Sequence, residues 1–138
     1  MKFTFSLFLL FILLAAGCNT GTSERNSASE GTIRVSLSID FDGRSDNLEF
    51  KDLELKEGKS VRDLFLVGEN NKLFSFSDTL YSGMGHLLLS INGMEPSGSV
   101  FWFYCVNGKK ANKGMDDYLL NEGDVVKWSL TDDNDPCD

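Results

Sequence analysis

The sequence predicts an α+β fold in which one short helix packs on one face of a sheet, for three reasons. Residues 32–41 alternate apolar and polar side chains, as a half-buried strand does. Ser60 and Asp63 have the spacing of a helix capping box. Two later apolar segments each end in Asn-Gly, a frequent turn after a strand. The resulting order of strands, one helix and further strands indicates an α+β sheet.

The elements of this domain can be placed in order along the chain. Residues 48–55 return antiparallel to the first strand, and their apolar phase changes near Lys51-Asp52, where we expect a bulge. The helix is expected from Ser60 to Val67 and to end at Gly68. In the second half, apolar or alternating segments predict three more strands, over residues 87–91, 100–106 and 125–130.

The first 17 residues are expected to be a lipoprotein signal peptide. Lys2 precedes an apolar stretch over residues 3–16, which is shorter than the roughly 20 residues of a membrane-spanning helix. Residues 14–18 read Leu-Ala-Ala-Gly-Cys and resemble the lipobox of bacterial lipoproteins. In such proteins cleavage precedes the cysteine, whose thiol carries a diacylglycerol and whose amino group is usually acylated. Cys18 is therefore the expected lipidation site, and an ordinary secreted protein is the alternative.

Charge and composition outline the mature chain and its surroundings. The formal net charge of −8 argues against a nucleic-acid partner, because phosphate binding needs clustered Lys and Arg. Residues 18–31 lack large apolar side chains and are expected to form a lipid-bearing flexible tether. The folded domain is then residues 32–130, and residues 131–138 form an acidic tail. We expect a cell-envelope protein, lipid-anchored on the extracytoplasmic side, in the outer membrane if the host is diderm.

Several short motifs in the domain resemble one family. They are Ser90-Ile91-Asn92-Gly93, the segment 102–108, Gly114 and the segment 123–128, with residues 57–61 matching the stretch before the family's helix. Together they resemble the C-terminal β-grasp domain of the vitamin B12 carriers transcobalamin and intrinsic factor, which also occurs in bacterial lipoproteins. The resemblance implies a ubiquitin-like β-grasp fold with a mixed sheet, and a binding module as the function.

The same resemblance implies a candidate ligand. In the vitamin carriers this domain closes over a ligand that a large α-helical barrel mainly holds, and 138 residues leave no room for such a barrel. Cobalamin or a related corrinoid is therefore the candidate small-molecule ligand, shared with a partner protein. No resident cofactor is expected.

Four consecutive aromatic residues, 101–104, place aromatic side chains on both faces of one strand. The polar tips of Trp102 and Tyr104 would tolerate solvent, whereas the resemblance implies that both lie in the core. We favour the second arrangement, which leaves three side chains on the open face: Phe101, Phe103 and Cys105. The alternative is that all of these aromatic residues serve packing alone.

The remaining cysteines and the single histidine each leave two interpretations open. Cys105 and Cys137 would form a disulfide in an oxidising envelope, with the tail folded across the open face, or Cys137 would stay free. His86 has no orienting acid nearby in the sequence. A hydrogen-bonded or solvated histidine is the simpler interpretation, and a lower ligand for corrinoid cobalt is the chemical alternative. We interpret Asp116, Asp117 and Asp124 as turn residues.

The favoured function is a lipid-anchored binding module without enzymatic activity, because no spacing indicates a catalytic or a metal site. The expected ligand or partner face consists of residues from the strand ends and loops: Met84, His86, Phe101, Phe103, Asn107 and Lys109. The second hypothesis is a protein-interaction or envelope-assembly module with no small-molecule ligand, in which the open face or an edge strand docks another polypeptide.

Overall fold

A computed structural model of the chain describes residues 31–132, 136 and 137. The predicted signal peptide, Cys18, nearly all of the tether and part of the acidic tail lie outside the described residues. Among the described residues, no helix combines the length and the apolar character that crossing a membrane requires.

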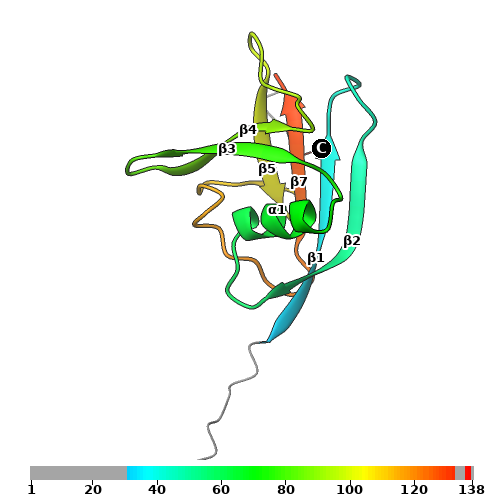
Figure 1. The fold of residues 1–138 in the computed structure, drawn as a ribbon, viewed down its shortest axis with the longest axis vertical. Coiled ribbons are helices and arrows are strands. Elements are labelled where there is room, and N and C mark those ends of the chain that lie inside the picture. Colours follow the sequence, from blue (N-terminus) through cyan, green and yellow to red (C-terminus); the bar gives the residue numbers. More distant parts are fainter. Residues whose placement is uncertain (1–30, 133–135, 138) are drawn as a thin grey trace, which may run out of the picture.

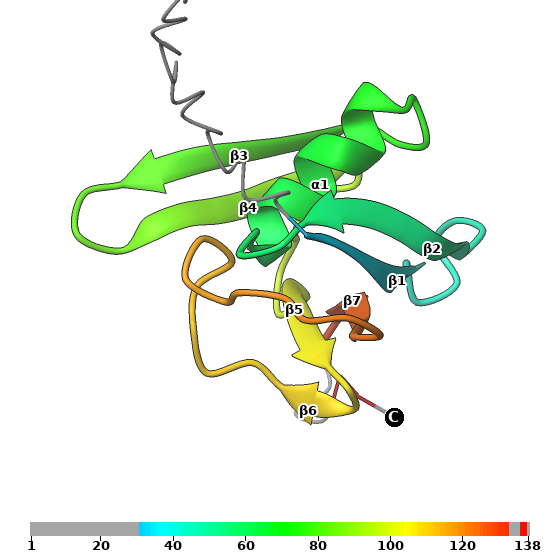
Figure 2. The ribbon, with the colours of Figure 1, turned by 90° about the horizontal axis from the view of Figure 1, so that it is seen from below.

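The main sheet has five strands in the order β2-β1-β7-β5-β6 (Figures 1 and 2). Their bounds are β1 Thr32–Asp40, β2 Leu48–Lys56, β5 Phe101–Val106, β6 Lys109–Lys110 and β7 Val125–Thr131. β1 pairs with β7 in parallel, and the other neighbours are antiparallel, so the sheet is mixed. With one helix on the sheet, this architecture confirms the predicted α+β fold of the β-grasp type.

β1 and β2 form the predicted antiparallel hairpin, and it carries the predicted bulge. The pairing register shifts between Val35, which faces Leu53, and Leu37, which faces Phe50. Within the shift, Asp52 has a positive φ of 54°. The change of apolar phase that the sequence shows near Lys51-Asp52 is therefore a local bulge in the edge strand.

The helix α1, Val61–Asn70, begins at the predicted capping box. The Ser60 side chain accepts a hydrogen bond from the Asp63 amide, and the Asp63 carboxylate accepts one from the Ser60 amide at 2.9 Å. The prediction that Gly68 ends the helix is wrong. Gly68 is buried inside it, and a Cβ there would lie 2.4 Å from the Phe74 ring. The glycine therefore serves close packing of Phe74 on the helix.

A second, two-stranded sheet lies on the same side of the main sheet as α1 (Figures 1 and 2). It consists of β3 Phe76–Tyr81 and β4 Gly85–Ile91, paired antiparallel, and we call it the ribbon. No strand was expected at β3, because its sequence Phe-Ser-Asp-Thr-Leu-Tyr does not alternate regularly, and its pairing register shifts between Ser77 and Asp78. The turn end of the ribbon projects beyond the edge of the main sheet (Figure 1).

The core lies between the main sheet and the layer formed by α1 and the ribbon. Tyr104, Val106, Val126 and Trp128 belong to it, and Trp102 packs against it partly buried. These positions confirm that the even-numbered side chains of β5 face inward. Phe101, by contrast, is 51% exposed.

The end of the chain covers part of the opposite face. Cys105 and Cys137 form a disulfide, with Cα atoms 5.7 Å apart, and the Ser129 hydroxyl donates a hydrogen bond to the carbonyl oxygen of Pro136 at 3.1 Å. Cys105 is consequently buried, although its strand position places it on the face that the sequence analysis expected to be open. Only Phe101 and Phe103 of the three expected side chains retain exposure there.

Candidate functional site

A groove of about 230 Å³ lies between the ribbon and the edge of the main sheet. Its lining comes from four parts of the chain: His86–Leu88 of β4, Trp102–Tyr104 of β5, Lys110 of β6 with residues 111 and 113–115 after it, and Trp128 of β7. The groove therefore exists only when segments from the whole second half of the chain have come together.

The short length of β6 creates the groove. β6 pairs only with Cys105 and Val106, and the Ala111 amide then donates a hydrogen bond to the carbonyl oxygen of Tyr104 at 3.0 Å. Beyond this point the chain leaves β5. The Tyr104 hydroxyl donates a hydrogen bond to the carbonyl oxygen of Lys113 at 2.6 Å, which ties the departing segment to the strand.

Aromatic side chains form the inner wall of the groove. Tyr104 stacks on Trp128 with ring centroids 4.8 Å apart and planes 20° apart. The Trp102 Nε1 atom donates to the carbonyl oxygen of Met94 at 3.3 Å. The Trp128 Nε1 atom is buried and has no hydrogen-bond partner among the described residues. A buried unpaired donor costs about 1–3 kcal/mol, so this atom lowers the stability of the folded state.

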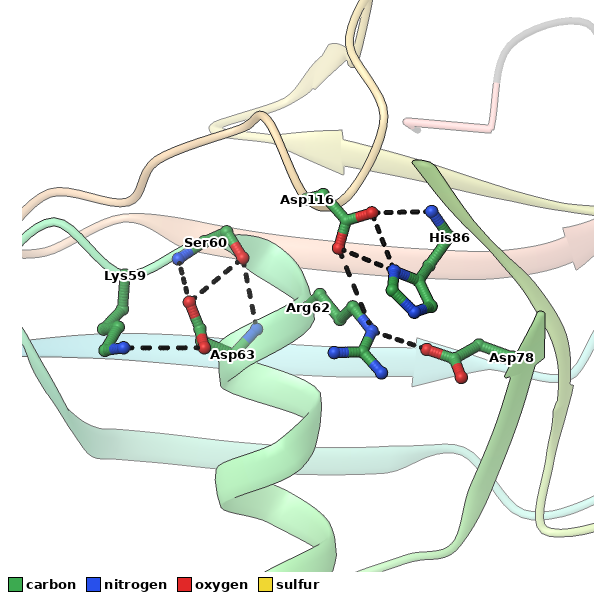
Figure 3. A network of polar contacts seen from close by, with 7 residues as sticks. All are labelled: Lys59, Ser60, Arg62, Asp63, Asp78, His86 and Asp116. Atoms are coloured by element: carbon green, nitrogen blue, oxygen red, sulfur yellow. Dashed lines mark hydrogen bonds and ion pairs between the residues drawn. The ribbon is translucent and has the colours of Figure 1, made fainter. Parts of the chain in front are cut away.

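His86 stands at the rim of the groove and is held by Asp116 (Figure 3). The Asp116 carboxylate accepts hydrogen bonds from the His86 amide at 2.6 Å and from its ring Nδ1 at 2.9 Å. The Arg62 Nε atom lies 3.8 Å from the same carboxylate and donates to Asp78 at 2.7 Å. Helix, ribbon and the loop before β7 therefore meet in one polar network.

The role of Asp116 differs from the sequence interpretation. We expected a turn residue, and the structure instead makes it the partner of a histidine 30 positions away. The contact requires Gly85, because a Cβ there would lie 2.7 Å from the Asp116 Oδ2 atom, and because Gly85 has a φ of +83°. No local sequence motif predicts a contact between residues so far apart. The only feature of the sequence that pointed to it is the Gly-Met-Gly segment before His86.

The electrostatics of the network favour an ionised Asp116. Partial burial raises the pKa of this carboxyl group. The hydrogen bonds from the His86 amide and ring and the positive charge of Arg62 outweigh that effect, so the pKa lies below its ordinary value of 3.8. The hydrogen bond to Asp78 correspondingly raises the pKa of the Arg62 guanidinium.

The structure brings only part of the predicted ligand or partner face together. His86 and Phe103 line the groove. Met84 is 79% exposed at the ribbon turn, and Phe101 is exposed at the start of β5. Asn107 joins the end of β5 to the start of β7. Its side chain donates a hydrogen bond to the Asp124 carboxylate at 2.8 Å and accepts one from the Val125 amide at 2.9 Å.

Lys110, the neighbour of the predicted Lys109, lines the groove, whereas Lys109 does not. Lys109 is exposed on β6, whereas the Nζ atom of Lys110 lies 4.4 Å from the centre of the Phe103 ring and Lys110 lines the groove. Sequence reasoning missed Lys110, Lys113 and Trp128 as groove residues. Only Trp128 carried a usable signal, since it alternates inward with Val126 and Leu130.

The described residues contain no group of three or more His, Cys, Asp or Glu side chains that could hold a metal ion. The groove lining also lacks Ser, Thr and Cys side chains. Burial raises the pKa of the Tyr104 phenol, with Tyr118 and Asp117 adding to the effect. The arrangement is therefore suited to holding an aromatic or apolar group that carries hydrogen-bond acceptors.

Comparisons with known proteins agree with this architecture. The sequence profile of a family described as a domain of unknown function, DUF4430, matches residues 64–132. No curated protein matches the chain. Among solved structures, haptocorrin in complex with Cbi is similar with a TM-score of 0.62 and 18% identity, over 77% of this chain and 28% of haptocorrin. The chain thus corresponds to little more than a quarter of that protein.

A second similar structure has nearly the size of the present domain. It is that of a candidate metal-binding protein from Ruminococcus gnavus ATCC 29149, with a TM-score of 0.52 and 14% identity, over 72% of this chain and 96% of that one. At these identities, both likenesses establish a common fold.

Replacing Asp116 by Asn should lower the free energy of unfolding at pH 7 by about 1–2 kcal/mol, because the amide cannot serve both hydrogen bonds and Arg62 equally well. A carboxylate with a lowered pKa stabilises the folded state at pH values above its ordinary pKa. This stabilisation is lost as the pH falls through the pKa that the group has in the folded state. Urea unfolding at several pH values should therefore show the difference between variant and wild type shrinking as the pH falls below the ordinary pKa of the carboxyl group.

The exposed neighbour Asp117 provides the matched control for this prediction. Asp117→Asn should change stability by less than about 0.5 kcal/mol. An Asp116→Asn effect that stays constant from neutral to acid pH would contradict the assigned role of the charge.

Proposed function

The chain belongs to the DUF4430 family, whose description leaves the function open, and we propose from the geometry of the groove that it is a ligand-binding module. The favoured ligand is cobalamin or a related corrinoid. The observation that carries this proposal is a groove walled by aromatic rings, with Tyr104 stacked on Trp128 and His86 at the rim. It supports a ligand that brings a flat, largely apolar group into the groove.

The size of the groove supports a shared ligand. Pockets that enclose a drug-sized molecule usually have about 300–1,000 Å³, and this groove has about 230 Å³. It would therefore hold one edge or one side group, with a partner protein covering the rest. The fold that haptocorrin shares with this chain covers 28% of that protein, and haptocorrin was solved in complex with Cbi.

The polar groups of the groove fit the edge of a corrinoid. Its amide side chains carry carbonyl oxygens that could accept from Lys113, an exposed residue of the lining. The other lining lysine, Lys110, holds its Nζ atom 4.4 Å from the centre of the Phe103 ring. Stacked rings such as Tyr104 and Trp128 provide apolar surface for the remainder of the ligand.

The same lining supports binding in preference to covalent catalysis. It offers no hydroxyl or thiol nucleophile other than the Tyr104 phenol, which is engaged with Lys113 and has a raised pKa. A nucleophile activated by an adjacent base is the usual sign of covalent catalysis.

We further propose that the module is lipid-anchored in the cell envelope through Cys18, on the strength of the lipobox-like residues 14–18. A polar tether after the anchor would keep the acidic domain away from anionic lipids. Fractionation of host cells is expected to find the wild-type chain with membranes. The Cys18→Ser variant should lose this association, and an unchanged membrane fraction would contradict the anchor.

The exposed ribbon favours a second candidate function, docking of another polypeptide. Large apolar side chains stand exposed along it: Leu80, Tyr81, Met84, Leu87 and Leu89. Exposed apolar patches commonly mark interaction sites. If this function holds, envelope proteins captured by the wild-type chain should be lost from a Met84→Ser, Leu87→Ser variant. They should be retained by Leu119→Ser, which removes an equally exposed leucine outside the ribbon.

Titration of the full chain in mild detergent with cobalamin and cobinamide tests the ligand proposal, with binding followed by quenching of tryptophan fluorescence. Trp128→Phe should weaken binding about five- to tenfold, because the groove wall loses part of its aromatic surface, while removal of the unpaired donor offsets the lost packing in the free energy of unfolding. Trp102→Phe, which loses a bond within the chain, should lower stability more and affinity less. Absence of wild-type binding at high micromolar concentration would overturn the corrinoid proposal.

A further inference from the structure

We propose that the Nε2 atom of His86 binds the metal ion of a planar metal macrocycle whose edge lies in the groove. This inference rests on the proposed ligand-binding function and specifies how the chain would recognise the ligand's centre. Three features carry it: the orientation of the imidazole, the scarcity of other metal-binding side chains, and the chemistry of the adjacent wall.

Asp116 fixes the orientation of the imidazole and the place of its proton. An ionised carboxylate can only accept hydrogen bonds, so the 2.9 Å contact requires that Nδ1 carries the hydrogen. In the neutral ring Nε2 then has a free lone pair, on the side of the ring away from Asp116 (Figure 3). No hydrogen bond joins Nε2 to another of the described residues.

This pairing is the outer-shell arrangement that prepares histidines for metal binding. A carboxylate that accepts from one ring nitrogen holds the ring in place and increases the basicity of the other nitrogen. Here the carboxylate is itself held, by the His86 amide at 2.6 Å and by Arg62 at 3.8 Å. His86 and Asp116 keep side-chain exposures of 25% and 29%, so the ring is fixed but accessible.

Among the described residues, His86 is not part of a larger cluster of metal-binding side chains. No cluster of three or more potential metal ligands occurs among them, whereas protein zinc sites use three or four side chains. A bare ion would therefore be held too weakly. A metal ion that arrives with four donors of its own, in a planar macrocycle, needs only one axial ligand from the protein.

The surroundings of His86 match the edge of such a macrocycle. Leu88 and Met115 are buried side chains that line the groove beside the aromatic wall. Lys113 is an exposed residue of the same lining and would attract carboxylates on the macrocycle. Corrinoids with amide side chains and porphyrins with carboxylates share this planar metal chemistry, and the experiment separates them.

The test uses the full chain in mild detergent, titrated with aquocobinamide in one arm and iron(III) protoporphyrin IX in the other. In at least one arm the visible spectrum should change to that of an imidazole-ligated metal. His86→Gly should abolish this spectral change, and free imidazole should restore it. Asp116→Asn should retain the spectral change with affinity about 10-fold lower, as expected for a partner of a metal-binding histidine.

Each contrary outcome has one meaning. If the wild type binds a macrocycle by fluorescence quenching, and His86→Gly binds it with the same spectrum, the axial role is wrong and the ligand-binding function stands. If the wild type binds neither macrocycle nor cobalamin, both proposals fail. If Zn²⁺ or Co²⁺ alone binds tightly and requires His86, the site is a bare-ion site and the macrocycle proposal is overturned.

Discussion

The parallel pairing of β1 with β7 is the interaction on which the rest of the structure depends. It joins the first and last strands of the domain, with Leu37 beside Val126 and Ile39 beside Trp128. Parallel neighbours need a long crossover connection, and here that connection contains α1, the ribbon, β5 and β6. Because β7 also pairs with β5, the same strand that closes the sheet carries Trp128 to the inner wall of the groove.

Local sequence signals were sufficient for the elements that local chemistry determines. The alternation of residues 32–41 and the Ser60–Asp63 capping box each reflect interactions within a few residues, and both appear as expected. Signals failed where packing in the folded chain decides the outcome. Gly68 resembles a helix end because glycine often follows one, but it lies inside α1, where it allows the Phe74 ring to pack closely.

The candidate site was harder to predict than the fold for the same reason. His86 stood out as the single histidine, but its meaning depends on Asp116, which arrives from a loop 30 residues later. Asn107 was equally conspicuous in the sequence, yet its hydrogen bonds to Asp124 and Val125 make it a brace between β5 and β7. Residue type thus identified chemically capable side chains, and tertiary structure determined which of them remain available to a ligand.

The disulfide between Cys105 and Cys137 has a consequence for how the domain withstands cleavage. Its two cysteines are separated by 32 positions in the sequence, and the bond encloses β6, the loop that lines the groove, and β7 within one covalent ring. A protease that cuts the exposed loop around Asn112 would open the ring without separating the fragments. The part of the groove formed by this loop and β7 would thus survive a single cut as a two-chain structure, still held in place by the sheet.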